Sequence, residues 1–219
     1  MFWITYVAIA SALTHSPASP DHIQPLAAPP SSSLVVVVEA APAIPHALVK
    51  RSLEEARSIW ATAGVSITWR FVEPSRPEEA FAIKVVLSDE PGAWHDSALP
   101  VGWIAFDGAG APDHTIHLSH DNASRLLNST SVYHDVPAVG QDVLLGRALG
   151  RALAHEMGHY LLRSKAHAQV GLMRRQLSLD DLFSESSASL WLDGCQRALI
   201  AEQWPESVRP VDPCRPSGQ

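Results

Sequence analysis

The chain has 219 residues, of which 46% are hydrophobic and 18% charged, and this length suits one domain with tails. Such a mixture is typical of a soluble globular protein and excludes a collagen, a coiled coil and a wholly disordered chain. Lys and Arg number 16 against 23 Asp and Glu, so the net charge is -7 and argues against a nucleic-acid partner. The 11 histidines are many for this length, and histidine is the commonest metal ligand.

The N-terminal residues form two segments of different composition. Residues 1–14 carry no charge and are largely apolar. This run is too short to span a bilayer but suits the apolar region of a secretory signal, although no basic residues precede it. Residues 15–32 are rich in Pro, Ser and Ala, which indicates a flexible linker. We therefore expect an exported protein, secreted or periplasmic, without a stable membrane span, in which residues 33–219 form one domain.

Hydrophobic spacing predicts the elements of that domain. Strands are expected at residues 33–40, 65–71, 80–87, 101–106 and 115–118. Helices are expected at 44–63, at 141–163 and within 185–203, with mostly loop over 119–140. Gly146 and Gly150 lie four apart on the long helix and predict close contact with a neighbouring element. The order predicts an α+β fold with a mixed, twisted sheet of about five strands, a backing helix, a long second helix and an irregular C-terminal part.

The long helix carries the sequence His-Glu-Met-Gly-His from His155 to His159, which is an H-E-x-x-H motif. Residues four apart lie on one helix face with Cβ atoms about 5–6 Å apart, so these two imidazoles can converge on one zinc ion. Glu156 is offset around the helix and can act as general base toward a zinc-activated water without being a ligand. Chance would produce the pattern in roughly three chains in a hundred. Its place on the most apolar long helix favours a zinc site.

A catalytic zinc site needs a third protein ligand. His167 follows His159, and the sequence Gly-Leu-Met ending at Met173 comes soon after. With these residues the chain resembles the metzincin branch of the zincin metallopeptidases, whose pattern is H-E-x-x-H-x-x-G-x-x-H followed by a turn containing Met. The resemblance implies that His155, His159 and His167 bind one Zn²⁺ and that Glu156 is the general base. It also implies that Met173 lies in a turn beneath the metal.

The chain departs from the metzincin pattern at several positions. The Gly of the family would fall at Leu162 and its third His at Lys165, whereas here the His comes two residues later. No Tyr follows Met173, so a Tyr cannot serve as ligand or oxyanion donor there. A downstream carboxylate such as Glu185, as in thermolysin-like enzymes, is the alternative to His167 as third ligand.

Other histidines are weaker candidates. His114, His117 and His120 are spaced like a metal-binding tract, but on a straight strand His114 and His117 point to opposite faces. Tyr133 and His134 could approach a substrate oxyanion, although exposed loop residues are the ordinary interpretation.

Cys195 and Cys214 are the only cysteines, and no C-x-x-C pair exists for a Cys-based zinc site. In an exported protein we expect the two to form a disulfide. In a cytosolic protein they would be two unrelated thiols.

These features predict a secreted zinc-dependent endopeptidase that hydrolyses peptide or protein substrates. By the family resemblance, the 101–106 strand would border the cleft and pair with an extended substrate. The alternatives are a non-catalytic peptide- or protein-binding protein on a zincin scaffold and a zinc hydrolase of non-peptide amides. The presence of Glu156 argues against the non-catalytic alternative.

Overall fold

The structure, a computed structural model, describes residues 33–72, 82–90, 100–130 and 136–204. The apolar segment and the linker expected in residues 1–32 lie outside the described residues, as do Tyr133, His134 and Cys214. Helices in the described ranges are each too short or too polar to cross a bilayer. The proposed disulfide and the proposed secretory signal therefore stay predictions.

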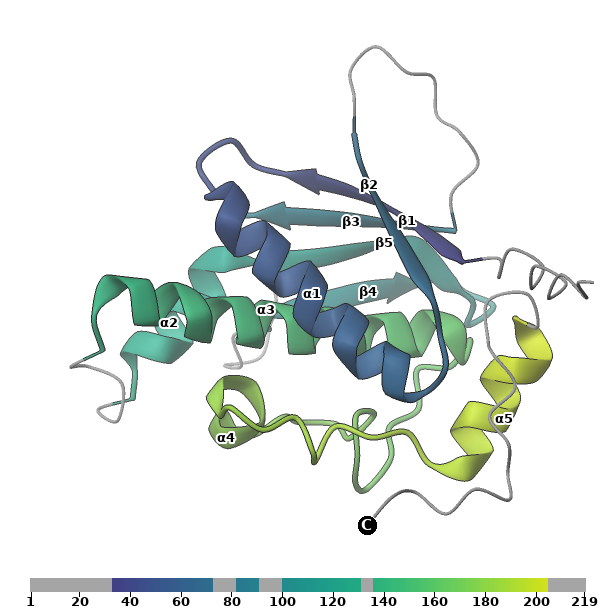
Figure 1. The fold of residues 1–219 in the computed structure, drawn as a ribbon. Helices are drawn as coiled ribbons and strands as arrows, with labels where there is room; N and C mark the ends of the chain where they lie inside the picture. The colour runs from purple at the N-terminus through teal and green to yellow at the C-terminus, as the bar shows by residue number, and fades with distance from the viewer. Residues whose placement is uncertain (1–32, 73–81, 91–99, 131–135, 205–219) are drawn as a thin grey trace, which may run out of the picture.

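Five strands form one sheet in the order β2-β1-β3-β5-β4 (Figure 1). The strands are β1 (Leu34–Ala40), β2 (Ile67–Phe71), β3 (Ile83–Ser88), β4 (Gly102–Phe106) and β5 (Pro112–Ser119). Four of them are parallel, and β4 runs antiparallel to β5. Leu34, Val36 and Val38 of β1 are buried and alternate with less buried residues, because successive side chains of a strand point to opposite faces. In the described part of the chain β4 pairs with β5 alone, so it is an edge strand.

Two long helices pack against each other beside the sheet. Helix α1 (His46–Thr62) connects the parallel strands β1 and β2, and α3 (Ala138–Leu161) contacts β4 and β5 (Figure 1). Gly146 and Gly150 of α3 face α1, as predicted. A Cβ at Gly150 would lie 2.5 Å from the Ser52 carbonyl oxygen, so only glycine allows this approach. The Trp60 indole of α1 donates a hydrogen bond to the Ala154 carbonyl at 3.2 Å. These contacts fix α3 on α1.

Residues 119–140 contain a helix, α2 (His120–Asn128), where mostly loop was expected. Ser119 caps this helix by accepting a hydrogen bond from the Asn122 backbone N–H at 3.1 Å. Asp121 and Arg125 form an ion pair at 2.8 Å one turn apart. The loop prediction was wrong because so short a helix offers too few apolar positions to reveal a helical period.

The C-terminal part contains two short helices, α4 (Leu179–Phe183) and α5 (Gly194–Gln203), which lie below α3 while the sheet lies above it (Figure 1). Arg151 of α3 is fully buried and joins three helices. Its Nε donates to Glu55 of α1 at 2.7 Å, and its Nη1 donates to the Asp181 carbonyl of α4 at 2.9 Å. The predicted α+β order is therefore confirmed, with the irregular C-terminal part anchored to the long helix.

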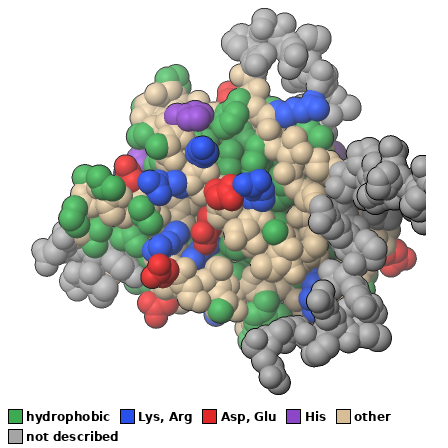
Figure 2. All heavy atoms as spheres, in the orientation of Figure 1, with side chains coloured by type: hydrophobic (Ala, Val, Ile, Leu, Met, Phe, Trp, Pro, Cys, Tyr) green, Lys and Arg blue, Asp and Glu red, His purple; other side chains and the backbone are tan. Residues whose placement is uncertain are grey.

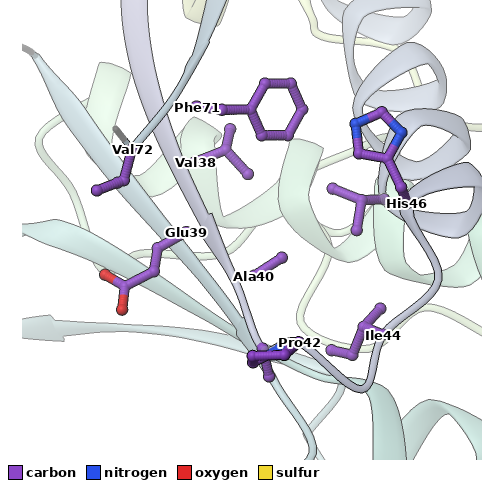
Figure 3. A pocket seen from close by; sticks show the side chains of 10 residues that line it. Val38, Glu39, Ala40, Pro42, Ile44, His46, Phe71 and Val72 are labelled. Carbon is purple, nitrogen blue, oxygen red and sulfur yellow. The ribbon is translucent and has the colours of Figure 1, made fainter. Parts of the chain in front are cut away.

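A cavity of about 410 Å³ opens where β1 and β2 end and α1 begins (Figure 3). Its walls are mostly apolar, and Phe71 and His46 stand beside each other with ring centroids 5.5 Å apart. None of the predicted site residues lines this cavity. The candidate site lies elsewhere, on α3.

Candidate metal centre

Three histidines meet at the C-terminal half of α3. The helix supplies His155 and His159, and the segment after it supplies His167. One ring nitrogen of each histidine lies within 4.8 Å of those of the other two. His155 and His159 are only 8% and 5% exposed, whereas His167 is exposed. The cluster therefore has a buried side formed by the helix and a side open to solvent.

Backbone carbonyls fix the orientation of the two buried rings. His155 Nδ1 lies 2.8 Å from the Leu172 carbonyl oxygen, and His159 Nδ1 lies 2.7 Å from that of Ser164. A carbonyl only accepts, so each Nδ1 must carry the proton that it donates. The two Nε2 atoms then both present lone pairs, and they lie 3.1 Å apart. Two acceptors at this distance in a buried site repel each other unless a cation lies between them.

The geometry of the pair suits a zinc ion. Zn–N bonds of about 2.0–2.1 Å in a tetrahedral site place two nitrogens about 3.3 Å apart. Burial lowers the pKa of His155 to about 4, and although the hydrogen bond to Leu172 opposes this, the neighbouring His159 and His167 lower it further. Burial is also the main reason that the pKa of His159 is lowered. Both rings are thus neutral at pH 7, as a metal ligand must be.

The turn after α3 brings His167 back to the helix without the glycine of the family pattern. Arg163 adopts a positive φ of 48°, a left-handed conformation that a glycine would take more readily. The helix ends at Leu161, and the turn brings the Ser164 carbonyl onto the His159 ring. The same turn therefore reverses the chain and orients a buried histidine.

Met173 packs against α3, the helix that carries His155 and His159. It is 1% exposed, and a Cβ at Gly158 would overlap its sulfur. The Met173 carbonyl accepts a hydrogen bond from the Ala168 N–H at 2.8 Å. The preceding carbonyl, that of Leu172, holds His155. The Gly-Leu-Met turn therefore supports the cluster through both a side chain and the backbone.

The Glu156 side chain extends from α3 toward the edge strand β4. Burial raises its pKa to about 8, and a backbone hydrogen bond with Ile104 of β4 partly opposes that effect. A Cβ at Gly102 of β4 would lie 3.2 Å from the Glu156 Cγ. Glycine at this position therefore gives the carboxylate its room beside the strand. Among the described residues Glu156 is not part of the histidine cluster, and with a pKa of about 8 its carboxyl is mostly protonated at pH 7 in the metal-free chain.

The weaker candidates lie elsewhere or have other partners. Glu185 is exposed just beyond α4 and does not belong to the cluster found among the described residues. His114 Nδ1 lies 3.0 Å from the Ala82 carbonyl, and His120 pairs with Asp89 at 2.8 Å. His117 stacks on Trp103 with ring centroids 5.2 Å apart. These three histidines do not converge on a common point.

Sequence reasoning missed the groups that position the site. The carbonyls of Ser164 and Leu172 belong to the backbone and leave no trace in residue type. Gly102 carried a usable signal, because a glycine inside a strand marks the close approach of another group. The motif on α3 did not reveal which group that would be.

Comparison with known proteins identifies the fold. No protein-family model matches the chain, and no curated protein matches its sequence. The crystal structure of archaemetzincin from Methanopyrus kandleri matches with a TM-score of 0.52 and 15% identity, over 81% of this chain and 98% of that chain. The crystal structure of myroilysin matches with a TM-score of 0.38 and 13% identity, over 80% and 84% of the two chains. The archaemetzincin match shows that this chain has a zincin-like α+β fold, as the sequence predicted.

Proposed function

We propose that this chain is a zinc-dependent endopeptidase in which His155, His159 and His167 hold the metal. The observation that carries the proposal is the pair of buried Nε2 lone pairs 3.1 Å apart, each fixed by a carbonyl behind its ring. Two facing lone pairs are costly in a buried site without a cation. Histidines that bind zinc usually donate their other ring N–H to a carbonyl or carboxylate, as these two do. The zincin-like fold supports the same assignment.

Zinc at this site would supply Lewis-acid activation of water and of the scissile carbonyl. The chain supplies the proton transfers. The Glu156 carboxylate takes a proton from the attacking water as the oxygen bonds to the carbonyl carbon. It then returns this proton to the amine nitrogen as the C–N bond breaks. Burial gives the Glu156 carboxylate a high proton affinity, and the positive charge of a bound zinc ion would favour its ionised form, so that it can take the proton.

The edge strand β4 supports a peptide as the substrate. It borders the site, because a Cβ at Gly102 would lie 3.2 Å from the Glu156 Cγ, and Phe106 lies edge-on to His159 with ring centroids 6.0 Å apart. In the described part of the chain its outer edge has no strand partner. An extended peptide can add there as a further strand, with its backbone hydrogen-bonded beside the metal.

The test combines metal analysis with a peptide-library digest of wild-type protein and Glu156→Gln. We expect one zinc per chain in both proteins and a turnover about 10²–10⁴-fold lower in the variant. Loss of zinc from Glu156→Gln would make Glu156 structural or ligating. Zinc-loaded wild-type protein that cleaves no peptide would favour a binding protein or a hydrolase of other amides.

A further inference from the structure

The segment that carries His167 is basic in an otherwise acidic chain. Between Met157 and Leu179 there is no Asp or Glu, while the segment holds Arg163, Lys165, Arg174 and Arg175. The chain as a whole has a net charge of -7. Figure 2 shows a different pattern over the α1 face, where Lys and Arg side chains alternate with Asp and Glu. Positive charge is therefore concentrated beside the candidate metal centre.

Two of these four cations have partners within the fold. Arg174 pairs with Asp181, which neutralises it. The Arg163 guanidinium lies over the Trp204 ring, 5.9 Å from its centroid. Lys165 and Arg175 are exposed, and in the described part of the chain neither has an ion pair or hydrogen bond through its side chain. The charge of these two residues is available to a ligand.

Arg175 is one residue from a backbone pairing that lies next to the third histidine. Ala168 and Arg174 form a β-bridge, which brings the next residue, Arg175, alongside the chain that leaves His167. Burial lowers the pKa of His167, and the positive charge of Arg175 lowers it further. Both Arg175 and His167 are exposed to solvent.

The surroundings of Arg175 favour an anionic ligand. A zinc ion would add further positive charge beside it, and the described chain places no carboxylate against it. A role in folding is a poor explanation, because the side chain is exposed and makes no ion pair or hydrogen bond with any of the residues that the structure describes. A guanidinium presents a planar set of donors that matches a carboxylate.

We propose that Arg175 binds a carboxylate of the substrate next to the metal centre and thereby sets the specificity of cleavage. The carboxylate belongs either to an Asp or Glu side chain near the scissile bond or to the C-terminus of the peptide. This inference deepens the proposed function and rests on it for its cleavage assay. Arg175 is a specificity residue in this account and takes no part in the proton transfers.

The first assay uses zinc-loaded wild-type protein, Arg175→Gln, Arg175→Lys and Arg125→Gln. The last is a matched control, because Arg125 is an exposed arginine on α2, outside the histidine cluster. Substrates are peptide pairs with Glu or Gln at each position near the scissile bond, and pairs that end in a free carboxylate or a carboxamide. We expect wild-type kcat/KM to favour the acidic member of one pair type by about tenfold, mainly through KM.

Arg175→Gln should bring that ratio near one while the neutral peptides are cleaved as before. Arg175→Lys should keep part of the preference, and Arg125→Gln should keep all of it. The Glu/Gln pairs report a side-chain carboxylate, and the acid/amide pairs report the C-terminal one. The inference fails if the wild type shows no preference, if Arg175→Gln keeps it, or if Arg175→Gln loses activity equally on neutral peptides.

A binding assay separates this inference from the proposed function. Calorimetry on Glu156→Gln, with and without Arg175→Gln, measures the affinity for the same peptide pairs when hydrolysis is slow. A preference for the acidic peptide that disappears with Arg175→Gln supports the inference even if wild-type protein cleaves nothing. Equal affinities for acidic and neutral peptides overturn it even if the protein proves to be a peptidase.

Discussion

At the scale of single residues, the three histidines are held in different ways. The rings of His155 and His159 are buried and tied to carbonyls, so their geometry exists before a metal arrives. The His167 ring is exposed, and the described residues give it no hydrogen bond. His167 therefore depends on the path of the backbone for its position. It is the proposed ligand whose loss most clearly tests the site.

Removal of the third ligand should weaken zinc binding much more than removal of the competing carboxylate. We expect His167→Ala to lower zinc affinity at least 100-fold, since two nitrogens leave the ion short of the three protein ligands usual in catalytic sites. Glu185→Ala should bind zinc as wild type does. Competition with a chromophoric chelator measures both affinities. Zinc retained in the first variant and lost in the second would transfer the role to Glu185.

Gly102 offers a test of Glu156 that leaves the carboxyl group in place. An added methyl would lie 3.0 Å from a Leu118 methyl and 3.2 Å from the Glu156 Cγ, so the base must move by a few tenths of an ångström. Gly102→Ala should keep its zinc and lose about tenfold in kcat. Gly108→Ala is the matched control, because no atom lies within 4 Å of its added Cβ. Full activity in Gly102→Ala would show that the position of Glu156 is not critical.

At the scale of elements, the turn after α3 stores a small amount of strain. Arg163 takes the left-handed conformation in place of the glycine that usually follows a helix. Its guanidinium gains a contact with Trp204, which offsets part of that cost. At the helix end, an unfavourable backbone conformation of Arg163 is therefore accompanied by a favourable contact of its side chain.

A comparison of Arg163→Gly with Arg163→Ala isolates the backbone effect, because both variants lose the contact with Trp204. Gly relieves the strain at φ 48° and Ala does not, so the Gly variant should be the more stable by about 1 kcal/mol. Urea denaturation of the metal-free proteins gives the two free energies of unfolding. Equal values would mean that the turn relaxes and carries no strain.

At the scale of the whole molecule, Asp181 connects the C-terminal part to the site. Burial alone would raise its pKa, but hydrogen bonds from Ser178 and Ser189 and the charge of Arg174 outweigh that effect and lower it. A carboxyl whose pKa is lower in the folded state stabilises the fold above its unfolded pKa of about 3.9. That contribution is lost as the pH falls through the folded pKa.

Asp181→Asn should therefore be less stable than wild type at pH 7, by about 1–3 kcal/mol, since one amide oxygen cannot replace both carboxylate acceptors. The difference should shrink as the pH falls from about 4, where the unfolded chain takes up a proton, through the lower folded pKa, where the wild-type carboxyl also becomes neutral. Guanidinium denaturation at pH 7 and pH 3 measures this. Asp180→Asn, on the exposed side of the same helix, should change little at either pH. A penalty for Asp181→Asn that does not vary with pH would argue against the charge effect.

The sequence predicted the parts of this molecule that depend on repeating patterns or on spacing along one helix. The five strands, α1 and α3 appeared in apolar periodicity, and the separation of His155 and His159 indicated a shared ligand. Helices α2 and α4 were missed because nine and five residues are too short for a period to emerge. The turn at Arg163 was not predicted, because its left-handed conformation is imposed by tertiary contacts and not by residue type.

The way in which the buried histidines are oriented has a consequence for how far such a sequence can diverge. The groups behind both rings are carbonyls of Ser164 and Leu172, which every amino acid possesses. Exposed side chains between these two positions can therefore change, provided that His167 keeps its place and Gly171 its positive φ of 80°. The sequence of this segment can diverge without loss of the geometry of the histidine cluster. A family profile built from residue identities would then cease to match while the histidine cluster kept its geometry.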